Sequence, residues 1–265
     1  MKKTILTSGL LLAFSGAAFA ESQEAETINP SDLTRVYTQA AVFLDSNADV
    51  RASGMWTGAW NDNIQFAGFA EGTFGNDKAK IEGKHKVGTD YQKGRAQYFQ
   101  VHALNNSLMP RIGFSTDLIH QNGEAGALKG SGLKDTTLFS AGAIGLINPA
   151  YTFGAKVFPN VAYTTGQVFG ESADGYMFNL FLTKEFGGSG SFIQFSPEYF
   201  KVEGDVVEME SSKLNFFISA PTRPDRSQWL MTRFEYGSAD VVLPDGTAID
   251  NDPELRVEIG MKWFF

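Results

Sequence analysis

The sequence predicts an all-β protein: a transmembrane, antiparallel, up-and-down β-barrel of about twelve strands, within a range of about ten to fourteen. Three observations predict this fold. Glycine (28 residues) and aromatic residues (13%) are abundant in the 265-residue chain, and aromatic side chains favour strands. Segments in which apolar and polar residues alternate recur along the chain, as in strands that have one apolar and one polar face. The connections between these segments alternate in length, which is typical of membrane barrels.

The composition excludes several classes of protein. The chain has no cysteine, which excludes a disulfide framework, a cysteine-ligated metal and a catalytic thiol. A net charge of −8 argues against a nucleic-acid partner, because an acidic chain repels the phosphate backbone. A mean hydropathy of −0.16 argues against a helical membrane protein. No motif resembles a phosphate loop, a dinucleotide fingerprint or a metal-binding helix, so we expect no cofactor and no metal.

Residues 1–20 are predicted to be a cleaved secretory signal. Two lysines, Lys2 and Lys3, precede a mostly apolar stretch, and small residues follow it. We expect cleavage between Ala20 and Glu21, and export of the mature chain.

The last twelve residues, 254–265, carry the clearest strand pattern in the chain. Every odd position from Leu255 to Phe265 is large and apolar, and the even positions up to Lys262 are charged or glycine. The segment also has about the length of 9 to 11 residues that a tilted strand needs to cross a bilayer. It therefore predicts a strand that faces lipid on one side and water on the other.

Residues 259–265 also resemble the C-terminal signature of Gram-negative outer-membrane β-barrels, which the barrel assembly machinery recognises through an aromatic last residue. The resemblance rests on four alternate residues: Ile259, Met261, Trp263 and Phe265. It implies a location in the outer membrane, and it implies contacts with lipid, lipopolysaccharide and the assembly machinery.

The barrel is predicted over residues 50–265. The segments read as strands are 50–60, 63–74, 78–88, 94–104, 110–120, 137–147, 152–165, 174–187, 191–203, 212–220, 227–239 and 254–265. With Phe265 in the periplasm, the connections 240–253, 204–211, 166–173, 121–136 and 89–93 are expected outside. Those at 221–226, 188–190, 148–151, 105–109 and 75–77 are expected at the periplasmic end.

The N-terminal segment, residues 21–49, is open to two interpretations. Residues 33–44 could form another strand, but a chain with both ends in the periplasm needs an even number of strands. The apolar residues of 33–44 also fit helical spacing, and we favour a short helix at the periplasmic rim or in the lumen. If this segment is a strand, then either 78–88 or 152–165 is not one.

The polar faces of these strands predict the lining of the lumen. A basic stretch near residue 80 places four charged residues on one face, where they could form a strip for anionic solutes or only a solvated surface. The predicted lining residues are Lys80, Glu82, Lys84, Lys86, Arg111, Asp117, Glu185, Glu198, Arg233, Glu235, Arg256, Glu258 and Lys262. Both signs occur, so these charges either pair and close a narrow lumen or set the selectivity of a pore.

Three histidines, His85, His102 and His120, are the candidates for a catalytic imidazole base. The residues from His120 to Gly123 are similar to an element of outer-membrane phospholipases, but the serine nucleophile of that element is missing here. The sequence therefore predicts a narrow passive channel for small hydrophilic solutes. A non-conducting structural or surface barrel is the first alternative, and an outer-membrane hydrolase is the second.

Overall fold

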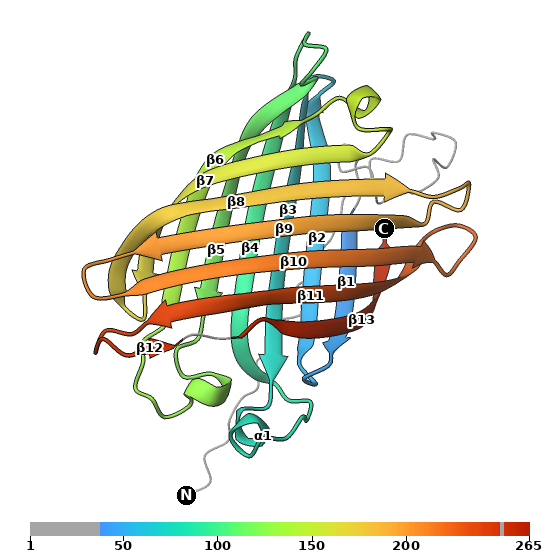
Figure 1. Ribbon diagram of the computed structural model, residues 1–265. Helices are drawn as coiled ribbons and strands as arrows, with labels where there is room; N and C mark the ends of the chain where they lie inside the picture. Colours follow the sequence, from blue (N-terminus) through green and yellow to red (C-terminus); the bar gives the residue numbers. More distant parts are fainter. Residues whose placement is uncertain (1–37, 250–251) are drawn as a thin grey trace, which may run out of the picture.

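The chain forms a closed antiparallel β-barrel of twelve long strands (Figure 1). The computed structural model describes residues 38–249 and 252–265. The strands of the wall are β1 (Thr38–Asp45), β2 (Val50–Asn61), β3 (Ile64–Gly75), β4 (Asp90–Ala103), β5 (Arg111–Gln121), β6 (Thr136–Leu146), β7 (Lys156–Val168), β8 (Glu171–Glu185), β9 (Phe192–Glu203), β10 (Glu208–Pro221), β11 (Gln228–Val242) and β13 (Glu254–Phe264). A two-residue strand, β12 (Ala248–Ile249), pairs with the end of β11.

Short helical elements lie in the connections. They are α1 (Asp77–Ile81) between β3 and β4, η1 (Gly126–Leu128) between β5 and β6, and η2 (Pro149–Tyr151) between β6 and β7. In the part of the chain that the structure describes, no helix is both long and apolar enough to span a membrane.

The barrel closes through β1, which pairs with β2 on one side and with β13 on the other. Phe43 lies opposite Arg51 on β2 and opposite Gly260 on β13. A Cβ atom at position 260 would lie 2.1 Å from the Phe43 ring, so the glycine leaves room for this ring to lie across the closing strand pair.

The prediction of a helix at 33–44 is wrong for its described part, because Thr38–Asp45 is a strand; residues 33–37 lie outside the described residues. Gln39, Ala41, Phe43 and Asp45 are buried, and the residues between them are exposed, so the segment also fits a period of two. The edges of β2 and β13 both have backbone groups that need hydrogen-bond partners. Pairing with these two strands therefore favours a strand over a helix for this segment.

The prediction of a strand at 78–88 is also wrong. Asn76 caps α1 by accepting a hydrogen bond from the backbone N–H of Ala79, and Gly83 then turns the chain with a φ of 65°. The predicted total of twelve strands is nevertheless confirmed, because the strand wrongly assigned at 78–88 and the strand missed at 38–45 cancel. The segment 152–165 is confirmed as β7, shifted to Lys156–Val168.

The connections differ from the expected alternation in length. At the end opposite the C-terminus, the connections 76–89, 122–135 and 243–253 are long, but β7 and β8 are joined only by Phe169 and Gly170, both with positive φ. The single connection 76–89 replaces the two expected at 75–77 and 89–93. Loop length is therefore a poor guide to sidedness in this barrel.

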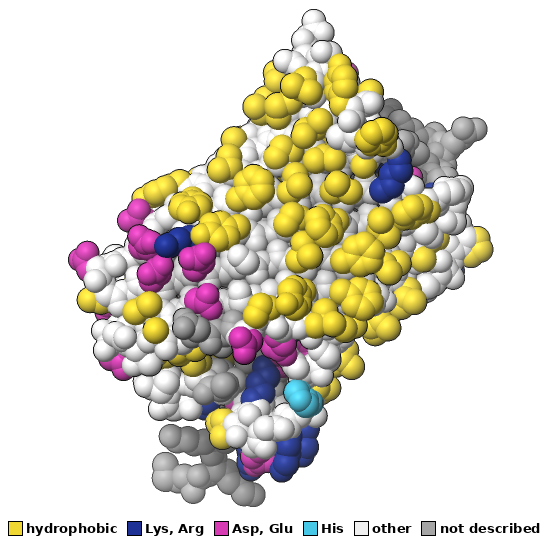
Figure 2. Space-filling view, in the orientation of Figure 1, with side chains coloured by type: hydrophobic (Ala, Val, Ile, Leu, Met, Phe, Trp, Pro, Cys, Tyr) yellow, Lys and Arg dark blue, Asp and Glu magenta, His cyan; other side chains and the backbone are white. Residues whose placement is uncertain are grey.

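Apolar side chains cover the outer wall of the barrel. Phe114, Val161 and Ile259 are 43%, 56% and 55% exposed, while Ser115 and Asp117 on the other face of β5 are buried. Figure 2 shows hydrophobic side chains spread over the wall, with most of the charged side chains of this face near the end that carries α1. The wall has the pattern expected of a barrel in lipid.

Clusters of buried apolar side chains lie inside the barrel, including one towards each end. Phe192, Trp229 and Phe264 are buried together towards the C-terminal end, where the Trp229 indole N–H donates to the Arg226 carbonyl oxygen at 2.6 Å. At the other end, Leu138, Met177 and Val202 belong to a larger cluster. These clusters fill parts of the lumen with side chains.

Trp229→Ala should lower the free energy of unfolding by about 3 to 5 kcal/mol, because it opens a cavity between Phe192 and Phe264. The measurement is the denaturant midpoint of lipid-refolded protein. Trp60→Ala is the matched control, since Trp60 is 67% exposed on the outer wall and its loss leaves no internal cavity. Equal losses in the two variants would contradict the buried cluster.

Candidate functional site: the lumen of the barrel

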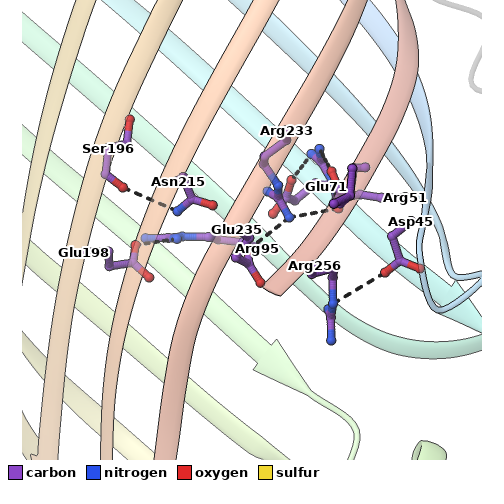
Figure 3. A network of polar contacts seen from close by, with 12 residues as sticks. Asp45, Arg51, Glu71, Arg95, Ser196, Glu198, Asn215, Arg233, Glu235 and Arg256 are labelled. Atoms are coloured by element: carbon purple, nitrogen blue, oxygen red, sulfur yellow. Dashed lines mark hydrogen bonds and ion pairs between the residues drawn. The ribbon is translucent and has the colours of Figure 1, made fainter. Parts of the chain in front are cut away.

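A chain of ion pairs runs along one wall of the lumen (Figure 3). Arg51 on β2 contacts Glu71 on β3 and Glu258 on β13, each at 2.6 Å. Arg233 on β11 contacts Glu258 at 2.8 Å and Glu235 at 3.1 Å. Glu258 therefore joins two guanidinium groups, and the five residues form one network.

A second group of ion pairs crosses the lumen. Arg95 on β4 contacts Asp117 on the neighbouring strand β5 at 2.5 Å and Glu198 on β9 at 2.8 Å. Since β5, β6, β7 and β8 separate β4 from β9 along the shorter way around the wall, the contact between Arg95 and Glu198 bridges the interior. Gln97 adds a hydrogen bond to Asp117 at 2.9 Å. The lumen is therefore narrowed at this level by a salt bridge.

These charges are tolerated because they compensate one another. The Arg51, Glu258, Asp117 and Glu198 side chains are 15% exposed or less, and a buried charge without a partner is costly. The Arg51 guanidinium also lies 4.1 Å from the centre of the Phe43 ring, which adds a cation–π contact. We call Arg51, Arg95 and Arg233, together with their five carboxylate partners, the ion-pair layer. These carboxylates are Glu71, Asp117, Glu198, Glu235 and Glu258.

A cavity of about 260 Å³ lies on the C-terminal side of the ion-pair layer. Arg51, Arg95 and Arg233 are among its lining residues. The rest of the lining is mixed: phenylalanine rings from several strands alternate with the amides of Gln39, Gln65, Asn179 and Asn215. The cavity thus offers both apolar surface and hydrogen-bonding groups.

Unpaired lysines lie on both sides of the layer. Lys93 on β4 and Lys213 on β10 share the inward face with Arg95 and Asn215, and no ion pair joins either lysine to another described residue. Lys262 lines the cavity and likewise has no ion pair among the described residues. The inward carboxylates, in contrast, have basic partners.

The structure places the predicted lining residues that lie on strands at several locations. Asp117, Glu198, Arg233, Glu235 and Glu258 belong to the ion-pair layer. Arg256 lies 3.7 Å from Asp45, and Glu185 lies 3.6 Å from Lys156. Arg111 is on the inward face of β5, with a buried guanidinium nitrogen that has no hydrogen-bond partner in the described chain. Lys262 lies at the cavity.

The predicted basic strip of Lys80, Lys84 and Lys86 does not lie on a strand, so this prediction is wrong. Lys80 lies on α1 and contacts Asp49 at 2.7 Å, outside the strand wall. Lys84 pairs with Glu82 at 2.9 Å on the exposed connection that follows, and Lys86 is exposed there too. The alternation of charges over 78–88 is therefore the pattern of a helical turn and a solvated loop.

Sequence reasoning missed Arg51 and Arg95, the two arginines around which the ion-pair layer is built. Both lie in predicted strands and share the face of polar neighbours, Ser53 on β2 and Gln97 on β4. The alternation of each strand was therefore sufficient to place them in the lumen. Their partners on distant strands could not be derived from any local pattern.

Another polar group lies on the outer side of the barrel. The His120 ring contacts the Tyr91 hydroxyl at 3.1 Å and the Asp135 carboxylate at 3.4 Å. Both ring nitrogens are used in these contacts, and the described structure places no serine or threonine hydroxyl on the ring. Within the same residues, no group of three or more histidine and acidic side chains could hold a metal ion.

Comparison with known proteins gives weak similarities of fold. No family model matches the chain, and no curated protein sequence matches it. Among solved structures, it is similar to the KdgM porin, with 10% identity, 87% of this chain and 99% of that chain covered, and a TM-score of 0.46. The NanC porin gives 8% identity, coverages of 85% and 98%, and a TM-score of 0.49. LpxR from Salmonella typhimurium gives 11% identity, coverages of 86% and 100%, and a TM-score of 0.39.

A further polar cluster joins two connections at the end opposite the C-terminus. The Asp77 carboxylate on α1 accepts hydrogen bonds from the Gln92 side chain at 2.6 Å and from the Gly126 backbone N–H at 2.9 Å, and it lies 3.2 Å from the Lys129 ammonium. Burial opposes the charge of Asp77, but these three donors outweigh it and hold the pKa of the carboxyl below its usual value. Asp77 therefore links the connection 122–135 to α1 through these contacts.

Arg95→Met should destabilise the barrel by about 3 to 5 kcal/mol, because it leaves the Asp117 and Glu198 carboxylates without their buried cation. Adding Asp117→Asn and Glu198→Gln removes both charges and should restore more than half of the loss. The measurement is the denaturant midpoint in lipid. Arg223→Met, at an exposed turn, is the control and should change stability by about 0.5 kcal/mol or less. A triple variant no more stable than Arg95→Met would contradict the mutual compensation.

The contact between 122–135 and α1 should weaken in acid. Since the folded-state pKa of Asp77 lies below its unfolded value of about 3.9, the stabilisation is present above that value and is lost as the pH falls through the folded pKa. The protection of Gly126 and its neighbours from hydrogen exchange, relative to the intrinsic rate at each pH, should therefore fall at the acid end of a pH series. Asp77→Asn should show fast exchange at neutral pH already. Identical exchange in the variant and the native chain at pH 7 would contradict this role of Asp77.

Proposed function

We propose that this chain is an outer-membrane channel for the passive diffusion of small hydrophilic solutes. The observation that carries the proposal is the closed barrel with an apolar outer wall and a charged lumen that contains a cavity. Because lipid offers no hydrogen-bond partners, every backbone N–H and C=O of a membrane-spanning structure must be hydrogen-bonded within the protein. A closed barrel meets this requirement. Charged side chains on the inward face are then supported by each other and by water.

The proposal also includes a route to the outer membrane. The proposal includes export by a signal cleaved between Ala20 and Glu21, and assembly through the C-terminal signature. Of the signature residues, Ile259, Met261 and Trp263 lie on the outer face of β13, where they would contact lipid. The end of the barrel with Phe265 is then periplasmic, and the end with α1 faces the cell exterior and its lipopolysaccharide.

The conducting path passes the ion-pair layer. A solute that enters from the periplasmic side meets the cavity first, then the bridge between Arg95 and Glu198, and then the inward face with Lys93 and Lys213. The carboxylates of the ion-pair layer are neutralised by arginines, while Lys93, Lys213 and Lys262 have no ion pair among the described residues. The chain carries a net charge of −8, but the free charges of its lumen are positive.

The refolded protein in a planar bilayer should show discrete conductance steps and prefer anions, measured as a reversal potential in a salt gradient. Lys213→Glu should shift this preference towards cations, because it replaces an unpaired lumenal cation by an anion. Lys78→Glu makes the same charge change on the exposed face of α1 and should shift it much less. An unchanged reversal potential in Lys213→Glu would contradict the proposed selectivity.

A non-conducting structural barrel is the second candidate, favoured by the salt bridge across the lumen and by the apolar clusters inside both ends. The same recordings separate the candidates. A correctly folded native chain that never conducts, together with a conducting Arg95→Ala and Glu198→Ala double variant, would establish that the ion-pair layer closes the barrel.

A further inference from the structure

We propose that the cavity beside the ion-pair layer is a binding chamber for a neutral, hydroxyl-rich solute of about monosaccharide size. Its volume of about 260 Å³ is several times the ~30 Å³ that one water molecule occupies in the liquid, so it can hold a small organic molecule. The inference deepens the proposed function by naming a class of solute, and it rests on that function only for the route by which the solute arrives.

The arginines of the chamber already have partners, and Lys262 is the basic residue of its lining that has no ion pair among the described residues. Arg51, Arg95 and Arg233 line the cavity, and each is held by two carboxylates. A charged ligand group would have to compete with ion pairs that are formed within the protein. The three arginines of the chamber wall therefore do not require a charged ligand as a partner.

Hydrogen-bonding groups of the wall, in contrast, lack partners. Five side chains that line the cavity each carry a polar atom that is shielded from solvent and has no hydrogen-bond partner among the described residues. These atoms are Gln39 Oε1, Gln65 Oε1, Asn179 Nδ2, Asn215 Oδ1 and Arg233 Nε. They come from five different strands, β1, β3, β8, β10 and β11, so they surround the cavity.

Such atoms are unfavourable unless a bound molecule supplies the missing partner. The set contains both acceptors and donors, and a hydroxyl group can serve either because it is itself donor and acceptor. A carboxylate could serve only the donors. The five groups therefore match a ligand with several hydroxyls better than an anion.

Much of the remaining wall of the chamber is aromatic. Phe43, Phe69, Phe99, Phe181 and Phe217 line the cavity together with the amides. A ring-shaped polyol presents apolar C–H faces and a rim of hydroxyls, so its faces can pack on phenyl rings while its rim reaches the amides. A hydrocarbon would fill the aromatic part but leave the amides unpaired, which again favours a sugar-like solute.

The test is a binding measurement on the refolded full chain in lipid nanodiscs, with D-glucose as the probe and saturation-transfer NMR and calorimetry as readouts. Binding should be saturable. Asn179→Leu keeps a side chain of similar size but removes the amide, and it should weaken binding about tenfold, as expected when one hydrogen bond is lost. Gln65→Leu on a different strand should weaken binding similarly, so the test does not depend on one variant.

The matched control is Gln100→Leu, which removes an amide from the outer face of β4, where Gln100 contacts Tyr98 and His102. Binding should be unchanged in this variant. The absence of saturable glucose binding, or equal binding in the Asn179→Leu and Gln65→Leu variants, would overturn the proposal.

A second probe and a second readout separate the remaining outcomes. Binding of D-glucuronate without binding of D-glucose would assign the chamber to anions held by Lys262 and would also overturn the proposal. Glucose binding by a chain that does not conduct would support the chamber and count against the channel. Conductance without glucose binding would support the channel and count against the chamber.

Discussion

The structure depends on the pairing of β1 with β13. In an apolar surrounding, an unpaired strand edge is too costly to persist, so twelve strands are stable there only as a ring. The pairing from Gln39 to Asp45 of β1 with β13 completes the ring, and it is made possible by Gly260, whose missing side chain admits the Phe43 ring. Closure also fixes which residues face inward, because each inward set follows from the register of its neighbours. The lumen is thus a consequence of this one strand pair.

Closure creates a second requirement inside the barrel. Charged residues that alternate with apolar ones along each strand are brought into a confined space, where their desolvation has to be compensated. The ion-pair layer meets this requirement with three arginines and five carboxylates from seven strands. The cavity next to it has no such compensation for its amides. The same interior therefore contains a region in which polar groups are satisfied by the protein and a region in which they are not.

The sequence was sufficient for the architecture because the alternation of apolar and polar residues is local. The strand 254–265 and most others appear within a few residues of their predicted bounds. The two errors have different causes. Residues 38–45 fit two periods, and only pairing with β2 and β13 decides between them, while the alternation over 78–88 is broken by the Asn76 cap of α1 and the turn at Gly83. The same limit applies to the site. Alternation places Glu198 and Glu258 on the polar face, but the contact of Arg95 with Glu198 joins residues 103 positions apart and depends on the curvature of the whole ring.

Glu258 accepts from two guanidinium groups, those of Arg51 and Arg233, and this sharing has an evolutionary consequence. A substitution at Glu258 removes one of the two carboxylate partners of both Arg51 and Arg233 at once, while a substitution at either arginine leaves Glu258 paired with the other. The three positions therefore differ in how freely they can vary: a change at one arginine removes one ion pair of Glu258, and a change at Glu258 removes an ion pair from both arginines. Among sequences that share this barrel, the order in which Arg51, Arg233 and Glu258 changed should therefore reflect how the lumen evolved.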